Sequence, residues 1–147
     1  MQTLTEHFTL DEFLHSETAI RKKIPNVPDE EQLDNIKHTA LLLEDVRSIL
    51  NRPVIITSGF RSPALNTAVG GAANSMHMRG LAADFICPQY GSPFIIIKKL
   101  LSSGLVFDQL IHEFGRWVHI STASVPRHMV LTVDHINGTR PGLHELA

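Results

Sequence analysis

The sequence predicts one α+β domain, with helices packed on a small, largely antiparallel sheet. Three observations support this class. The chain has 147 residues, the size of one ordinary domain. A long segment with helical periodicity lies in its first third, at residues 29–50. Short apolar segments of strand length follow, separated by glycine, proline and polar residues, at 54–57, 81–86, 109–114, 117–121 and 128–133.

The N-terminal third is predicted to be helical. Thr9 and Glu12 form a capping-box pattern that opens a short helix ending near His15, and a proline-containing connection follows at residues 22–28. In residues 29–50, apolar side chains recur at steps of three and four, which indicates a helix with one buried face. Acidic residues at its start suit the helix dipole. This long helix is predicted to be scaffold.

Short strands and short helices alternate in the middle of the chain. Residues 54–57 and 81–86 are apolar enough to form buried strands. Ser-Pro pairs predict helix starts for the segments 62–69 and 92–103, because serine caps a helix and proline suits its first turn. Small residues at 70–74 predict a flexible loop that allows close backbone approach.

The predicted domain covers residues 1–133, with its last strand at 128–133. Residues 134–147 are polar and contain two glycines and a proline. We therefore expect this C-terminal tail to be loosely ordered or to lie over the surface.

Composition excludes several classes of partner and site. The formal net charge is −2, which gives no electrostatic basis for binding nucleic acid. The one cysteine, Cys87, allows neither an internal disulfide nor a multi-cysteine metal site, and we expect it in the core. No apolar run approaches the roughly 18 residues that span a membrane. The N-terminus lacks a secretion-signal pattern, so we expect a protein that is cytoplasmic as synthesised. We also expect a monomer.

His77 and Asp84 are candidate metal ligands. Zinc accepts imidazole nitrogen and carboxylate oxygen, and catalytic zinc sites commonly have three protein ligands. Gly80 argues against a continuous helix, so we expect His77 in a loop and Asp84 on the following strand. Alternation in residues 117–121 places His119 opposite the apolar strand face, where it can point into a cleft as a third ligand. The alternative is that these are unrelated surface side chains.

The position of Glu113 depends on the register of the predicted hairpin at residues 109–121. If the turn contains only residues 115–116, His112 lies opposite His119, and Glu113 faces the other way. If the loop has an odd number of residues or a bulge, Glu113 shares the face of His119. A carboxylate in a buried cleft needs a partner or a function. Glu113 beside His119 is therefore a candidate catalytic group, and an exposed Glu113 at the sheet edge is the alternative.

Arg61 and Ser75 are candidate substrate-binding residues. Arg61 follows the first predicted strand, and its guanidinium suits a substrate carboxylate or a developing oxyanion. A surface ion pair is the alternative for Arg61. Ser75 and Ser58 could both hydrogen-bond within the site. A triad of Ser75, His77 and Asp84 would make a serine hydrolase, but no Gly-x-Ser-x-Gly elbow is present.

Four segments together resemble the zinc D-alanyl-D-alanine carboxypeptidase superfamily. They are Ser58-Gly-Phe-Arg61-Ser, the pattern Ser-x-His-x-x-Gly-x-Ala-x-Asp from Ser75 to Asp84, Asp108-Gln-Leu-Ile-His-Glu113, and Trp117-Val-His119. The superfamily includes bacterial wall carboxypeptidases, vancomycin-resistance dipeptidases and phage endolysin peptidases, and shares its fold with the hedgehog signalling domain. The similarity runs from about Phe8 to Ser121 and is closest to the short, single-domain branch.

The resemblance implies a zinc ion held by His77, Asp84 and His119. It also implies Glu113 as the general base and Arg61 as the arginine that stabilises the substrate or the transition state. Ser75 is a candidate partner for orienting an imidazole. In many relatives the base lies closer to the last histidine than it does here, so Asp108 and His112 are alternatives to Glu113.

The implied function is that of a zinc metallopeptidase acting on D-amino-acid-containing peptides of bacterial peptidoglycan. It would remove a terminal D-alanine or cut a cross-link, with Glu113 accepting the proton of the attacking water. A domain without a signal peptide fits a phage or prophage lysis enzyme that reaches the cell wall after release. The alternative is a non-catalytic zinc-containing recognition module, as in hedgehog-type relatives, which would not need Glu113.

Overall fold

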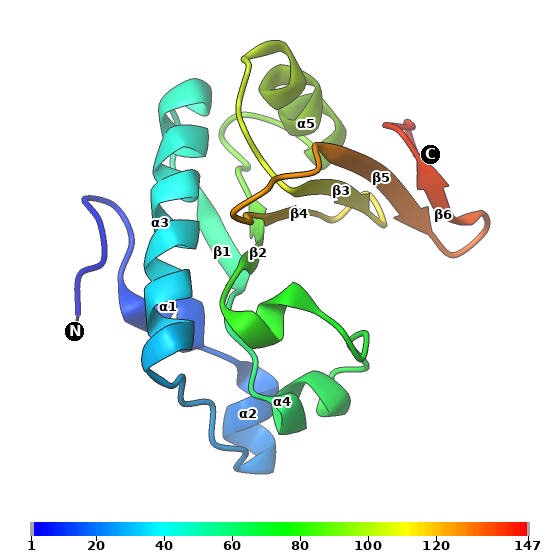
Figure 1. Cartoon of the computed structure of the whole chain (residues 1–147). Coiled ribbons are helices and arrows are strands. Elements are labelled where there is room, and N and C mark those ends of the chain that lie inside the picture. The colour runs from blue at the N-terminus through cyan, green and yellow to red at the C-terminus, as the bar shows by residue number, and fades with distance from the viewer. Residues whose placement is uncertain (1, 147) are drawn as a thin grey trace.

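Helices surround a six-stranded sheet in the computed structural model, which describes residues 2–146 (Figure 1). The helices are α1 (Leu10–Leu14), α2 (Glu17–Lys22), α3 (Glu30–Leu50), α4 (Pro63–Ala68) and α5 (Pro93–Ser102), and a 3-10 turn, η1, spans Met76–Arg79. The strands are β1 (Ile55–Ser58), β2 (Ala82–Ile86), β3 (Gln109–Glu113), β4 (Trp117–Ser121), β5 (Met129–Asp134) and β6 (Gly138–Pro141). This arrangement confirms the predicted α+β class. Within the described residues, no helix has both the length and the apolar character needed to cross a bilayer.

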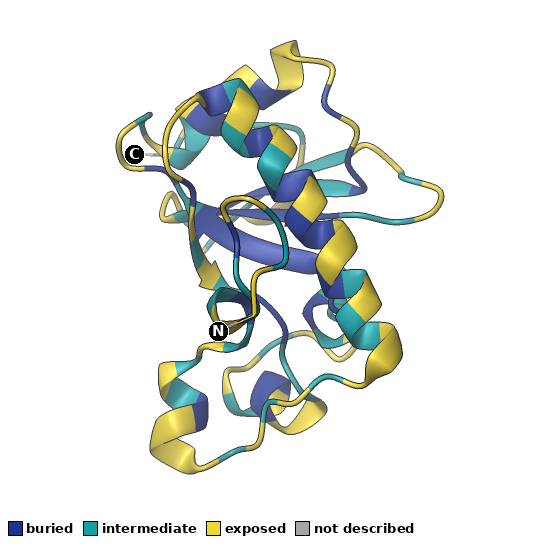
Figure 2. Cartoon of the chain, turned by 90° about the vertical axis from the view of Figure 1, so that its left-hand side faces the viewer, coloured by how far each residue is buried: buried dark blue, intermediate teal, exposed yellow. Residues whose placement is uncertain are grey.

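The long helix α3 is the scaffold that the sequence predicts. Asp29 caps its start, because the Asp29 carboxylate accepts a hydrogen bond from the Gln32 backbone at 2.8 Å and the Gln32 side chain accepts one from the Asp29 backbone at 2.8 Å. Asn51 ends the helix in the left-handed conformation, with a φ of 51°. One stripe of α3 is buried against the molecule and the other is exposed (Figure 2). The buried stripe includes Ile36, Ala40, Leu43, Val46 and Leu50.

The sheet separates a packed core from a functional face. Its strand order is β1-β2-β4-β3-β5-β6, and the pairing of β3 with β5 is parallel. Leu110, Val118 and Ile120 point into the core, where α5 packs on β3 and β4. Because side chains alternate along a strand, Ile111 and His119, which are directly opposite each other, project from the other face. That second face carries the candidate site.

Three elements of the structure are absent from the prediction: helix α2, strand β6 and the 3-10 turn η1, which contains His77 where a loop was expected. Helix α2 is only one and a half turns long, and Ser16 caps it by accepting a hydrogen bond from the Ala19 backbone at 3.1 Å. Strand β6 pairs antiparallel with β5. Residues 138–141 of the predicted tail form β6, the outer strand at one edge of the sheet. The predicted domain boundary after residue 133 falls inside β5.

Gly80 closes the turn between the candidate ligands His77 and Asp84. Its φ is 78°, and a Cβ atom at this position would lie 2.6 Å from the Gln32 carbonyl oxygen in α3. Gly104 has the same φ of 78° but no atom within 4 Å of such a Cβ. The two glycines therefore differ in crowding and not in backbone conformation.

We expect Gly104→Ala to lower the free energy of unfolding by about 1 kcal/mol, from backbone strain alone. Gly80→Ala should lower it by about 2–4 kcal/mol, because α3 and the turn must also move apart. Urea denaturation of the two variants beside the parent protein measures both losses. Equal losses would show that the close approach of Gly80 to α3 contributes nothing.

Candidate metal centre

Three candidate ligands meet at the functional face of the sheet. His77 lies in η1, whereas Asp84 and His119 are directly opposite each other in the antiparallel pair of β2 and β4. The ligand atoms of the three residues all lie within 4.8 Å of one another. All three are buried, with exposures of 3%, 5% and 7%. The fold thus gathers the three residues that the sequence singles out.

The orientation of His77 is fixed by the backbone around it. Its ring Nδ1 lies 2.7 Å from the Gly59 carbonyl oxygen. Because a carbonyl can only accept, Nδ1 carries a hydrogen and the Nε2 of the neutral ring presents a lone pair. This Nε2 faces Asp84 Oδ1 at 3.2 Å. Ser75 accepts a hydrogen bond from the His77 backbone N–H at 3.2 Å, so its hydroxyl holds the turn, and the carbonyl of Gly59 holds the imidazole.

The donor set around Asp84 fits a zinc ion. Asp84 Oδ1 lies 2.9 Å from His119 Nδ1 as well as close to His77. Burial raises the pKa of Asp84, but the adjacent imidazoles of His77 and His119 hold that pKa well below its usual range. The carboxylate is therefore ionised. Two imidazole nitrogens and a carboxylate oxygen facing one point are a common zinc ligand set, and a cation there would relieve the contact between lone pairs.

The hairpin of β3 and β4 places Glu113 beside the ligands. Its loop has three residues, 114–116, two of them in the left-handed conformation with φ of 57° and 68°. Of the two registers that the sequence allows, the odd-numbered loop is the one observed, and Glu113 pairs with Trp117. Glu113 Oε1 lies 3.7 Å from His119 Nδ1, and the Trp117 indole N–H donates to Glu113 Oε2 at 3.1 Å.

The surroundings of Glu113 make it a better proton acceptor. Burial raises its pKa, and the negative charge of Asp84 raises it further. His119, the Trp117 N–H and Arg61 act in the opposite direction without reversing the shift. A raised pKa brings the group closer to the range in which a general base works well near neutral pH. Glu113 thus combines a raised pKa with a position beside the candidate ligands.

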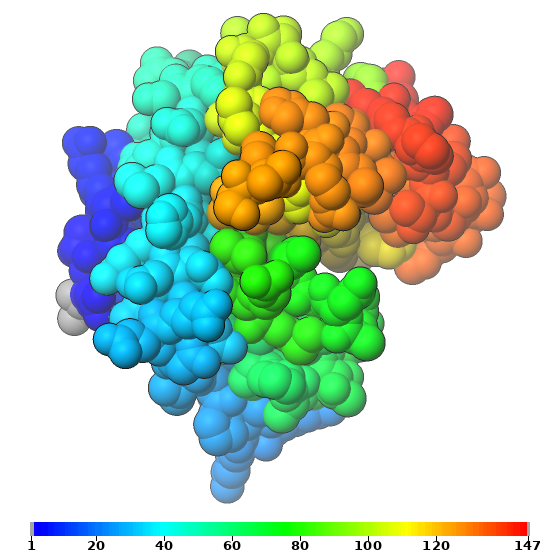
Figure 3. Space-filling model, viewed as in Figure 1, coloured from blue at the N-terminus to red at the C-terminus, as the bar shows by residue number. Residues whose placement is uncertain are grey.

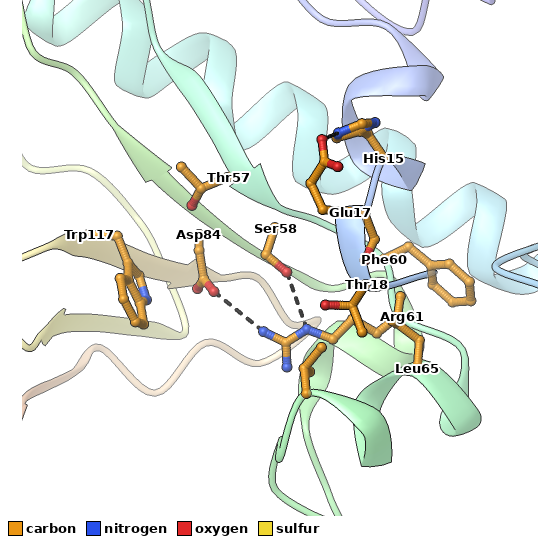
Figure 4. A pocket seen from close by; sticks show the side chains of 12 residues that line it. His15, Glu17, Thr18, Thr57, Ser58, Phe60, Arg61, Leu65, Asp84 and Trp117 are labelled. Atoms are coloured by element: carbon orange, nitrogen blue, oxygen red, sulfur yellow. Dashed lines mark hydrogen bonds and ion pairs between the residues drawn. The ribbon is translucent and has the colours of Figure 1, made fainter. Parts of the chain in front are cut away.

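Arg61 connects the end of β1 with the turn that contains His77. Its guanidinium donates from Nε to Ser58 Oγ at 3.2 Å, from Nη1 to Asn66 Oδ1 at 3.1 Å and from Nη2 to Asp84 Oδ2 at 3.5 Å. Figure 4 shows the Arg61 guanidinium joined to both Ser58 and Asp84, with Trp117 on the other side of Asp84. The Arg61 backbone N–H donates to the His77 carbonyl at 3.1 Å. Arg61 is therefore tied to both the β1 end and the ligand turn.

The two alternatives to Glu113 lie away from the ligands. Asp108 accepts hydrogen bonds from Arg127, at 2.8 Å and 2.9 Å, and these hold the pKa of Asp108 below its usual value. His112 faces the core, with its ring centroid 6.2 Å from that of Phe94, and burial lowers its pKa. Neither residue lines the cleft that contains the ligands. Cys87 is fully buried, as predicted.

The ligands and Glu113 line a cleft of about 570 Å³. The loop at residues 70–76 forms one wall and the hairpin of β3 and β4 the other. Figure 3 shows the surface hollowed between the green segment that contains this loop and the orange-to-red C-terminal strands. A second cavity of about 450 Å³ adjoins the cleft. Four residues line both spaces: Arg61, Val69, Asp84 and Trp117.

Three participants in the site were missed in the sequence. Gly59 acts through its carbonyl oxygen, a group common to all residues, so no side-chain pattern marks it. Trp117 shares the strand face of His119, and this alternation is the signal that could have found it. Arg127 lines the cleft from the connection between β4 and β5, where no periodic pattern applies.

Comparison with known proteins identifies two similarities. The family model described as peptidase M15 matches residues 6–121, a range that contains every candidate ligand as well as Glu113 and Arg61. The zinc D-Ala-D-Ala carboxypeptidase of Streptomyces albus G is 53% identical to this chain over 34 residues. That segment covers 23% of this chain and 13% of the relative, so the similarity spans a small part of the relative's length.

Proposed function

The chain belongs to the M15 family of zinc peptidases, and we propose that it hydrolyses D-amino-acid-containing peptides of bacterial peptidoglycan. The observation that carries this proposal is the position of Glu113, which lies in one cleft with three buried candidate ligands. The name of the Streptomyces relative supports the substrate class, because it specifies a D-Ala-D-Ala peptide.

In this proposal, His77 Nε2, Asp84 Oδ1 and His119 Nδ1 hold the zinc. When bound, zinc lowers the pKa of a water ligand toward neutrality and polarises the carbonyl of the scissile bond. The Gly59 carbonyl keeps His77 in the tautomer that presents its Nε2 lone pair to the metal. The ionised Asp84 supplies the negative charge of the ligand set.

Glu113 and Arg61 carry the proton and charge chemistry. Glu113 accepts a proton from the attacking water and returns it to the leaving amine. The Trp117 N–H holds Glu113 Oε2, which leaves Oε1 directed toward His119. Arg61 lies where the two cavities meet, and its N–H groups stabilise the negative charge that develops on the carbonyl oxygen.

The proposed reaction is either removal of a terminal D-alanine or cleavage of a cross-link, since both use the same residues. A zinc-containing recognition module would need the three ligands but not Glu113, so Glu113 beside them favours the enzyme. The monomeric state and the role in phage lysis stay predictions.

Chelation tests the proposed function directly. We expect the purified protein to release peptide fragments from purified peptidoglycan, to stop releasing them in 1,10-phenanthroline, and to resume when zinc is added back. Mass analysis of the fragments distinguishes loss of D-alanine from cleavage of a cross-link. A protein without stoichiometric zinc, or digestion that continues in the chelator, would contradict the proposal.

A further inference from the structure

We propose that Arg127 binds a carboxylate group of the peptide substrate in the metal cleft. This inference rests on the proposed function of that cleft. Arg127 lies in the connection between β4 and β5, beyond the residues that match the family. It is one of the residues that line the cleft together with His77, Asp84 and His119.

A buried carboxylate fixes the guanidinium of Arg127. Asp108, which is 1% exposed, accepts hydrogen bonds from Arg127 Nε at 2.9 Å and from Nη2 at 2.8 Å. The Arg127 backbone N–H also donates to Asp108 at 3.0 Å, and the Ser121 hydroxyl donates to it at 3.4 Å. Two parallel bonds to one carboxylate hold a guanidinium in a defined plane. Asp108 is therefore a positioning residue for Arg127.

The bonds to Asp108 leave one edge of the guanidinium available. Nε and Nη2 form the edge that Asp108 occupies, and the adjacent edge consists of one N–H from Nη1 and one from Nη2. Among residues 2–146, no acceptor hydrogen-bonds Nη1. The side chain of Arg127 is 47% exposed. Arg127 lines the cleft, and a preorganised pair of parallel donors suits a carboxylate.

The position of Arg127 relative to the ligands matches a substrate group near the scissile bond. The Asp108 backbone N–H donates to the Ser121 carbonyl at 2.8 Å, so the pair of Asp108 and Arg127 lies at the level of Ser121. Ser121 is two residues beyond His119 on β4, a separation of roughly 7 Å along the strand. An extended peptide spans roughly 3.5 Å per residue. Arg127 can therefore reach a carboxylate one or two residues from the bond that is cut.

Arg61 and Arg127 have different surroundings. The guanidinium of Arg61 already donates from all three of its nitrogens, to Ser58, Asn66 and Asp84, and Arg61 adjoins the ligand group. Arg127 has a single partner side chain and lies along the cleft. The first arrangement suits stabilisation of charge at the reacting carbonyl, and the second suits recognition of a charge on the substrate.

The alternative role for Arg127 is that of a structural clamp, which would join the β4–β5 connection to the sheet. Arg140 provides the matched control for this alternative. Arg140 donates from Nη2 to Asp134 at 3.1 Å, and its pairing lies in β5 and β6, outside the cleft. Removal of a structural clamp would lower the stability of the protein and weaken the binding of every peptide form alike. Removal of a binding residue would instead abolish the preference for a carboxylate over its neutral amide.

The test uses three forms of the synthetic pentapeptide L-Ala-γ-D-Glu-L-Lys-D-Ala-D-Ala: the free acid, the C-terminal amide, and the form with D-isoglutamine at the second residue. Calorimetry measures the binding of each form to zinc-loaded Glu113→Gln protein, in which turnover is suppressed. The same titrations are made with a double variant that carries both Glu113→Gln and Arg127→Gln. The glutamine amide at position 127 can still donate to Asp108 but carries no charge. The double variant with Glu113→Gln and Arg140→Gln is the control. Thermal melting of all variants reports their stability.

We expect one of the two amidated peptides to bind about tenfold more weakly than the free acid. The position of its amide identifies the carboxylate that Arg127 binds. Arg127→Gln should weaken binding of the free acid about tenfold and abolish the difference, whereas Arg140→Gln should preserve the ratio. Equal affinity for all three forms, an unchanged ratio in Arg127→Gln, or no binding at all would overturn the inference. Failure of the proposed function appears separately, as absence of cleavage by the protein that retains Glu113.

Discussion

Replacing His77 with alanine is expected to give a protein with neither bound zinc nor peptidase activity. The three candidate ligands lie within 4.8 Å of one another, and removal of one leaves a site with two protein ligands. Loss of even an outer partner of a metal ligand lowers metal affinity about 10- to 100-fold, so loss of a ligand should lower it by more than about 100-fold. Metal analysis of the purified variant and digestion of peptidoglycan measure the two effects.

The same substitution should lower the stability of the protein. The His77 ring is buried and donates to the Gly59 carbonyl, so alanine leaves a cavity and removes that hydrogen bond. We expect a loss of about 2–3 kcal/mol in the free energy of unfolding without metal. Added zinc should raise the melting temperature of the parent protein and leave that of His77→Ala unchanged.

An exposed histidine provides the control for His77. His38 is exposed in α3, and its ring bonds to the Asp34 carbonyl one turn earlier. His38→Ala should therefore retain zinc, activity and the response of the melting temperature to zinc. A His77→Ala protein that still carries one zinc per chain would remove His77 from the ligand set.

The sequence predicted the grouping of the three candidate ligands better than it predicted the position of Glu113. The ligands follow from local rules: Gly80 must turn the chain between His77 and Asp84, and strand alternation decides the face of His119. The face of Glu113 depends on the number of residues in the hairpin loop, and thus on whether residue 114 adopts the left-handed conformation. For a residue other than glycine, that conformation is set by tertiary packing more than by its own preference.

Among the helices and strands, too, the sequence predicts those with a strong local pattern and misses those that depend on tertiary contacts. Helix α3 was predicted because apolar residues recur at helical steps throughout residues 29–50, and the structure begins the helix at Glu30, after the Asp29 cap. Helix α2 has six residues and β6 has four, too few for a periodicity to emerge. Strand β6 also begins with a glycine and ends with a proline, residues that normally argue against a strand. Its pairing with β5 comes from the tertiary structure.

Glu113→Gln is expected to keep its zinc and to lose about 10²- to 10⁴-fold in kcat. Glutamine preserves the shape of the side chain, and its carbonyl oxygen can still accept the Trp117 N–H, but it cannot take a proton from water. Metal content and kcat measured on the same preparation separate the two effects. Glu44→Gln is the control, because Glu44 bonds to His7 far from the cleft and should affect neither quantity.

The pH dependence distinguishes a base from a merely structural carboxylate. A base must be ionised to act, so kcat of the parent protein should rise with pH through the pKa of Glu113, and Glu113→Gln should lack this rise. Burial and Asp84 raise the pKa of Glu113 in the folded state, so its ionisation destabilises the zinc-free fold as pH rises from its unfolded to its folded pKa. Above that window, zinc-free Glu113→Gln should therefore melt no lower than the parent protein. A folded Glu113→Gln variant that keeps the parent's kcat and pH profile would remove Glu113 from the mechanism.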